Sequence, residues 1–168
     1  RFTIGKQSIN SAKITVNDVT YTGEAQTPDV TVTLADGKVL SADSYTVKYK
    51  NNKDVGTATV IVTAVEGGNY IGSVEGSFKI QAIDIADAVI TAIEDQTYTG
   101  SAICPDIEVK YGDKILTEGE DYVVDSYTDN ENVSTVSKKA CVTIKGKGIY
   151  VGTCSAKFSI VPASIENA

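Results

Sequence analysis

Residues 21–34 read YTGEAQTPDVTVTL, and residues 98–111 repeat this pattern as YTGSAICPDIEVKY, 77 positions further along the chain. After the proline of each copy, apolar and polar residues alternate, which is the period of a β-strand with one buried face. A second match joins Tyr70 to Tyr150, which lie 80 positions apart. The chain therefore contains two copies of one β-rich unit, and the second copy carries small insertions.

The repeats and their turns predict the architecture. We expect repeat 1 over residues 9–82 and repeat 2 over residues 83–162, each near the lower size limit for a self-sufficient core. Turn-forming residues recur at intervals of about 10 residues, among them Gly37, Asn51 and Asp129, which tolerate a positive φ. This spacing predicts six or seven short strands per unit, arranged as a sandwich of antiparallel sheets with one polar outer face each.

The two ends of the chain resemble parts of the repeats. Phe2 and Ile4 match the Phe-x-Ile pattern that closes both repeats, so residues 1–8 are expected to be the end of a preceding repeat or a leader strand. Residues 165–168 match the lead into repeat 2, so residues 163–168 are expected to be the start of a further repeat or a linker. We therefore interpret the sequence as a piece of a longer tandem array.

The order of these motifs resembles the tandem bacterial Ig-like repeats, of the MBG/YDG type, found in large bacterial cell-surface proteins. The matching residues of repeat 1 are Tyr21, Gly23, Pro28, Tyr45, Asn51, Asn52, Val55, Gly56, Ala58, Val60, Gly68, Asn69, Tyr70, Gly72, Phe78 and Ile80. The resemblance covers both units, although repeat 2 departs from it at Ser134 and Ile149. It implies an all-β fold of two tandem Ig-like antiparallel β-sandwich domains, in a secreted or cell-surface protein with a stalk or adhesin role. The resemblance assigns no functional residue to this chain.

Composition argues against several classes of function. The chain has no histidine, and its 15 basic and 22 acidic residues give a formal net charge of −7. Without histidine there is no imidazole base for a nucleophilic triad, so we expect no enzyme and no cofactor. The acidic balance argues against nucleic-acid binding, which requires basic residues to neutralise phosphates. No run of apolar residues is long enough to predict a membrane span.

The three cysteines all lie in repeat 2. Strand alternation places Cys104 and Cys141 on the outer face, where they could be cross-strand neighbours and form a disulfide. It places Cys154 on the inner face with Ala156 and Phe158. The alternative is that all three are small packing residues or free thiols.

An acidic loop in repeat 2 contains Asp125, Asp129, Asn130 and Glu131. Oxygen ligands at this spacing could hold Ca²⁺. However, repeat 1 has lysines in the matching loop, and the Gly-centred Asp-x-Asp pattern is missing. A solvated acidic loop is therefore the competing interpretation, and we expect no metal site.

Two functional hypotheses follow. The first is a non-catalytic spacer, because the positions that match between the repeats are core and turn residues. It is expected to be monomeric, with neighbouring repeats of the same longer chain as its partners. The alternative is an adhesin module that binds a carbohydrate or a host surface protein. Tyr127 is the one aromatic residue that favours this alternative. It lies five residues after Tyr122, so strict alternation places the two rings on opposite faces of the strand and predicts that Tyr127 is exposed.

Overall fold

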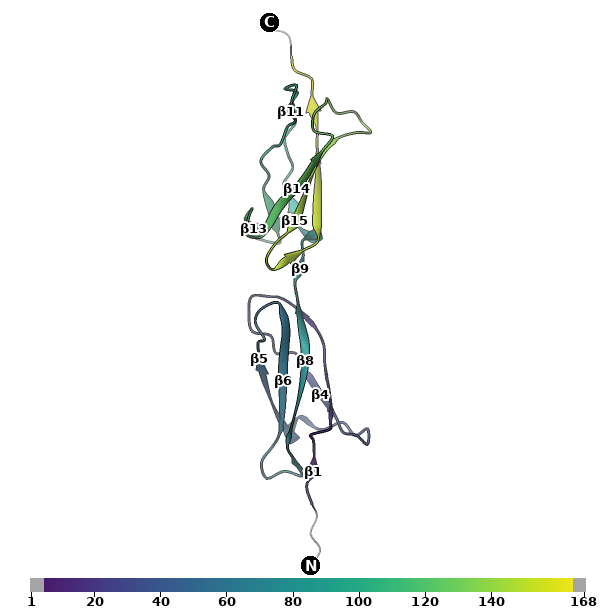
Figure 1. The fold of residues 1–168 in the computed structure, drawn as a ribbon, viewed down its shortest axis with the longest axis vertical. Helices are drawn as coiled ribbons and strands as arrows, with labels where there is room; N and C mark the ends of the chain where they lie inside the picture. Colours follow the sequence, from purple (N-terminus) through teal and green to yellow (C-terminus); the bar gives the residue numbers. More distant parts are fainter. Residues whose placement is uncertain (1–4, 165–168) are drawn as a thin grey trace, which may run out of the picture. The chain divides into compact units, whose positions relative to one another are not determined.

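The chain folds almost entirely into β-strands joined by turns (Figure 1). The computed structural model describes residues 5–164, which divide into two compact units with the boundary between Ala82 and Ile83. The helical elements of this described part are two 3-10 turns, Ala42–Ser44 and Ile85–Asp87. Neither turn has the length or the apolar character needed to cross a membrane. The all-β fold class predicted from the alternating sequence is confirmed.

Unit 1 contains two sheets and one short additional pair. Its strands are β1 (Gln7–Ser8), β2 (Lys13–Val16), β3 (Val19–Thr20), β4 (Val30–Thr33), β5 (Tyr45–Lys50), β6 (Gly56–Ala64), β7 (Tyr70–Ile71) and β8 (Ser73–Gln81). The larger sheet has the order β3-β8-β6-β5, the smaller sheet pairs β2 with β4, and β1 pairs with β7.

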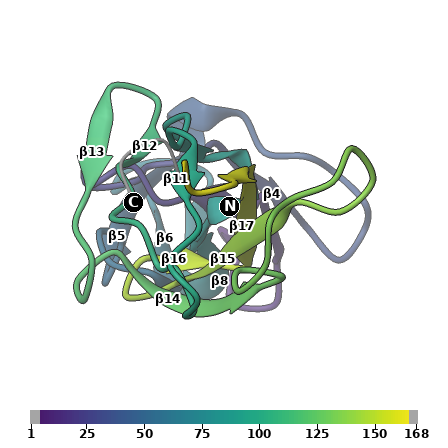
Figure 2. The ribbon, with the colours of Figure 1, turned by 90° about the horizontal axis from the view of Figure 1, so that it is seen from above.

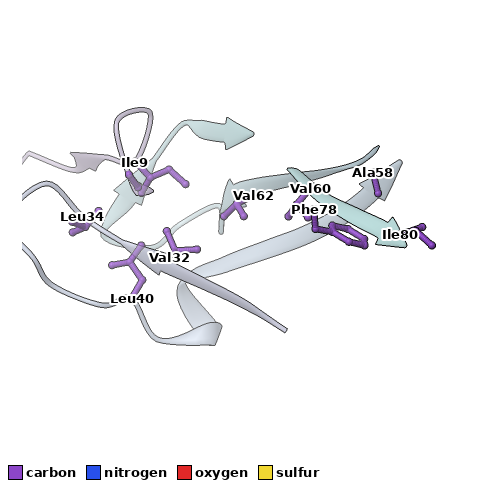
Figure 3. Close-up of a cluster of buried hydrophobic side chains, with 10 residues drawn as sticks. Ile9, Val32, Leu34, Leu40, Ala58, Val60, Val62, Phe78 and Ile80 are labelled. Atoms are coloured by element: carbon purple, nitrogen blue, oxygen red, sulfur yellow. The ribbon is translucent and has the colours of Figure 1, made fainter. Parts of the chain in front are cut away.

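The hydrophobic core of unit 1 draws on both sheets (Figure 3). Its buried side chains include Val32, Leu34 and Leu40 from β4 and the segment after it, and Ala58, Val60, Val62, Phe78 and Ile80 from β6 and β8. Along β6 the buried residues alternate with more exposed ones, as the sequence predicted. Burial of these apolar side chains is the main source of stability for a unit of this size.

Unit 2 repeats this plan with shorter pairings. Its strands are β9 (Ile83–Asp84), β10 (Val89–Ile90), β11 (Gln96–Thr97), β12 (Val109–Tyr111), β13 (Lys114–Leu116), β14 (Tyr122–Thr128), β15 (Ala140–Gly146), β16 (Tyr150–Val151), β17 (Thr153–Phe158) and β18 (Ile160–Val161). One sheet has the order β14-β15-β17 and another the order β10-β12-β13. Figure 2 shows β12 and β13 on the opposite side of the unit from β14 and β15, with the segment between β14 and β15 projecting as a yellow-green loop.

Four short strand pairs run parallel, whereas the sequence predicted antiparallel sheets. They are β1 with β7 and β3 with β8 in unit 1, and β9 with β16 and β11 with β18 in unit 2. The alternating pattern indicates which face of a strand is buried but says nothing about its neighbour or its direction. For this reason the pattern could not predict these pairs.

The start of unit 1 also differs from the expected boundary. Gln7 and Ser8 form β1 and pair with Tyr70 and Ile71 of the same unit, although the sequence analysis assigned them to a segment before repeat 1. In unit 2 the matching strand, β9, pairs with β16 in the same manner. The other matches at the chain ends, from Phe2 to Ile4 and from Ile165 onwards, lie outside the described residues.

The turns form where the sequence predicted them. Gly37 has a φ of 87°, and the Leu34 amide donates to the Lys38 carbonyl at 2.8 Å to close the hairpin. Asn51 and Asp129 both have a φ of 54°. A left-handed backbone at non-glycine residues is uncommon, and asparagine and aspartate tolerate it best. The two units therefore turn at matching positions with matching geometry.

A bulge in β14 overturns the prediction that Tyr127 is exposed. Val124 pairs with Ile144 and Ser126 pairs with Thr143, so Asp125 is an extra residue on this strand. One extra residue reverses the parity of every residue after it. Tyr127 consequently turns inward, is partly buried and packs against the core.

Candidate functional site

Two tyrosines at matching positions hold the segment that precedes β4 in unit 1 and β12 in unit 2. The hydroxyl of Tyr49 donates to the Pro28 carbonyl at 2.6 Å, and that of Tyr127 donates to the Pro105 carbonyl at 2.8 Å. Each ring also meets a core phenylalanine edge to face, with centroids 6.2 Å and 6.4 Å apart. Burial raises the pKa of both phenols. Both rings therefore take part in holding the fold.

Two asparagines make a second recurring contact. The Asn52 side-chain amide donates to the Gln26 carbonyl at 2.7 Å, while the Gln26 backbone amide donates to the Asn52 carbonyl at 2.7 Å. In unit 2, Asn130 makes the same two bonds with Ile103, at 3.0 Å and 2.9 Å. Each asparagine thus satisfies both backbone groups of a residue that lies outside any strand.

A lysine rests on a tyrosine in both units. In unit 1 the Lys38 ammonium lies 2.9 Å from the Tyr70 hydroxyl and 5.7 Å from the ring centroid. In unit 2 the Lys114 ammonium lies 5.2 Å from the Tyr150 centroid and pairs with the Asp121 carboxylate at 3.0 Å. The hydrogen bond to Tyr70 raises the pKa of Lys38, and the bond to Asp121 raises the pKa of Lys114. These pairs were not predicted from the sequence, although both lysines follow a turn glycine by one or two residues.

A hollow of about 530 Å³ lies beside the Lys38–Tyr70 pair in unit 1. Lys6, Gln7 and Asn69 complete its lining together with three glycines. Its two ammonium groups could attract an anion. Both lysines are exposed, however, and no buried polar group is directed into the hollow.

A groove of about 560 Å³ is present in unit 2. Residues 91–94 and Gln96 line one side, and residues 104–108 line the other. In unit 1, β2 and β4 pair over four residues, whereas β10 and β12 pair over two. The strands of unit 2 therefore separate earlier, and we refer to the space between them as the unit 2 groove.

The unit 2 groove carries acidic residues on both of its sides. Glu94, Asp106 and Glu108 all line it. Glu108 accepts a hydrogen bond from the Thr91 hydroxyl at 3.0 Å and pairs with Lys110 at 2.7 Å. Hydrogen bonds from Lys110 and Thr91 lower the pKa of Glu108. Chemically, the groove could accept an extended chain with basic side chains, because sheet edges pair with extended partners.

The three cysteines are free thiols, so the structure contains no bond between Cys104 and Cys141. Cys104 is exposed and lines the unit 2 groove. Cys141 lies on β15, opposite Thr128 of β14 and Lys157 of β17. Cys154 faces the core as predicted, and its thiol donates to a backbone carbonyl at 3.2 Å. Burial raises the pKa of the Cys154 thiol.

The residues of the acidic loop have different surroundings in the structure. Asp129 pairs with Lys138 at 2.7 Å, and the side-chain amide of the buried Asn130 donates a hydrogen bond to the Ile103 carbonyl. Asp125 is the exposed bulge residue, and Glu131 is exposed. Among residues 5–164, no three acidic, cysteine or histidine side chains lie close enough to share a metal ion.

No protein-family model matches the chain, and no curated protein matches it.

Proposed function

We propose that this chain consists of non-catalytic Ig-like spacer repeats of a bacterial cell-surface or secreted protein. In this role the two units present other domains or contribute to adhesion, with neighbouring repeats of the same longer chain as their partners. The tandem sequence pattern, the all-β fold and the acidic surface all support the proposal. A negative net charge keeps a repetitive protein soluble and discourages self-association.

One observation carries the proposal: the hydrogen bonds that hold the fold recur in both units, whereas several residues that line the unit 2 groove differ from their counterparts in repeat 1. The bonds of Tyr49 and Asn52 reappear at Tyr127 and Asn130. By contrast, Cys104 of the unit 2 groove occupies the position of a threonine in repeat 1. A shared ligand site would preserve the lining residues, whereas a spacer needs only the frame.

An adhesin module is the second candidate, and the unit 2 groove is the observation that favours it. The groove is open, lies beside an incompletely paired strand and carries three carboxylates. These features suit a protein or peptide partner better than a carbohydrate, because no exposed tryptophan is available to stack on a sugar.

The test is binding of the full chain to arrays of glycans and of host surface proteins. The spacer proposal predicts no saturable binding. Two variants make the test specific: Asp106→Ala removes a carboxylate of the unit 2 groove, and Asp29→Ala removes its counterpart in unit 1. Saturable binding that Asp106→Ala abolishes and Asp29→Ala preserves would replace the spacer with the adhesin module.

A further inference from the structure

Parallel strand pairs join the beginning of each unit to its end. In unit 1, β1 and β3 come early in the chain, and they pair in parallel with β7 and β8, which end the unit. In unit 2, β9 and β11 pair in the same way with β16 and β18. In Figure 1, β1 lies at one end of unit 1 and β8 leads out at the other.

In unit 1 the pairing of β3 with β8 extends beyond its two-residue ladder. The Tyr21 amide donates to the Gln81 carbonyl at 2.9 Å. On the other side of β3, the Asp18 carboxylate accepts a hydrogen bond from the Lys79 amide at 2.7 Å. A side chain thus supplies a bond where the backbone ladder ends, and the whole contact spans residues 18–21.

Unit 2 builds the equivalent contact from backbone groups. The Gln96 amide donates to the Ser159 carbonyl and the Tyr98 amide donates to the Val161 carbonyl, each at 2.9 Å. Between them lies the parallel ladder of β11 and β18. Both units therefore close with a short parallel contact between an early strand and the last strand.

The direction of these strands decides how they respond to tension. When the two ends of a unit are pulled apart, an early strand is drawn backward and the parallel last strand is drawn forward. The strands must then slide past each other, so all the bonds between them carry load together. In an antiparallel hairpin pulled at its open end, the bonds would instead break one after another. Forced unfolding is governed by the unfolding rate. A contact whose bonds must all break together slows unfolding under load, so it raises the force that the unit withstands.

We propose that each unit is a mechanical clamp, in which the parallel contacts β3–β8 and β11–β18 resist tension applied along the chain. The biological meaning of this property rests on the proposed spacer function: a spacer that holds another domain under flow or adhesion carries load through every repeat. The clamp itself is a property of each unit and is testable without knowledge of any ligand.

The test is single-molecule force spectroscopy on the full chain with handles at its two ends. The wild-type chain is expected to give two unfolding events, one for each unit. Gln96→Pro removes the amide that donates to Ser159, whereas Gln96→Ala removes only the side chain. We expect Gln96→Pro to lower the force of one event, and Gln96→Ala to leave both events at wild-type force.

A stability control separates mechanical from thermodynamic effects. Val142→Ala weakens the core of unit 2 without touching the parallel contact. At a matched loss of equilibrium stability, it should lower the unfolding force less than Gln96→Pro. Equal losses of force for these two variants, or equal forces for Gln96→Pro and Gln96→Ala, would overturn the clamp.

A second pair of variants covers the case in which Gln96→Pro fails to fold. Asp18→Ala removes the acceptor for the Lys79 amide, and Asp18→Asn keeps an oxygen acceptor at the same place. Only Asp18→Ala should lower the force of the unit 1 event, and a loss of force with both variants or with neither would overturn the clamp. The binding arrays test the spacer function independently of the clamp, because a ligand could bind a unit whatever force is needed to unfold it.

Discussion

Deletion of Asp125 should be tolerated, which is unusual for a deletion inside a β-strand. Asp125 is the extra residue of the β14 bulge, and it separates Tyr122 from Tyr127 by five positions. In unit 1 the matching tyrosines, Tyr45 and Tyr49, are four positions apart on a strand with continuous pairing. Removing Asp125 gives unit 2 the same spacing as unit 1, so both of its tyrosines keep their inward direction without a bulge.

The magnitude follows from what each side chain contributes. Asp125 is exposed, so its deletion should change the free energy of unfolding by no more than about 1 kcal/mol. Deletion of Val124 is the matched control, because it gives the same tyrosine spacing but places Asp125 in the inward position. That variant loses a partly buried apolar side chain and turns a carboxylate toward the core. We expect it to cost about 3 kcal/mol or more.

The assay is urea unfolding of the full chain followed by tyrosine fluorescence, with circular dichroism as a second probe. The reasoning predicts a small change in the midpoint of unit 2 for the Asp125 deletion and a large decrease for the Val124 deletion. Equal destabilisation by the two deletions would refute the assignment of Asp125 as a bulge residue that only sets parity.

Three further predictions follow from the same contacts. Tyr49→Phe and Tyr127→Phe each remove one hydroxyl bond to a proline carbonyl and keep the ring, so each should lower the stability of its own unit by about 1 kcal/mol, or about 4–8 °C in Tm by calorimetry. Burial alone would raise the pKa of Asp121, but hydrogen bonds from a backbone amide and a lysine lower it overall. Its carboxylate therefore stabilises unit 2 fully above its ordinary pKa and progressively less as the pH falls through the lowered value, and Asp121→Asn should flatten the acid side of the stability curve in melts recorded from about pH 6 to pH 2. Cys104 is exposed and Cys154 is partly buried with a raised pKa, so iodoacetamide should modify Cys104 first and Cys154 only slowly in a mass-spectrometric time course.

The sequence predicted the buried faces well, because alternation reports burial directly. Val32 and Leu34 in repeat 1 and Val109 in repeat 2 are buried as expected. The turns at Gly37 and Asn51 were also predictable, since few residues accept a positive φ. The prediction that Tyr127 is exposed was wrong because strict alternation holds only for a strand without a bulge. The 77-residue offset of Tyr122 from Tyr45 and the 78-residue offset of Tyr127 from Tyr49 contained the signal for the bulge.

The contacts between segments were beyond sequence reasoning for a different reason. The parallel pairs and the unit 2 groove depend on which strands become neighbours, and a local pattern carries no such information. Asn52 was noted among the residues that match the repeat family and Asn130 in the acidic loop, but their bonds to Gln26 and Ile103 bridge about 26 residues of chain. The recurrence of a residue in both repeats indicates that it matters, while its partner is visible only in the structure.

Amide hydrogen exchange by NMR tests most directly the central claim that the recurring residues build the same hydrogen-bonded frame in both units. Gln26 and Ile103 lie outside the strands, and their amides donate to the Asn52 and Asn130 carbonyls. Both amides should be strongly protected, and to a similar degree, whereas those of their exposed neighbours should exchange rapidly. If Gln26 and Ile103 exchange as fast as these neighbours, or if only one of the two is protected, the two units do not share the frame described here.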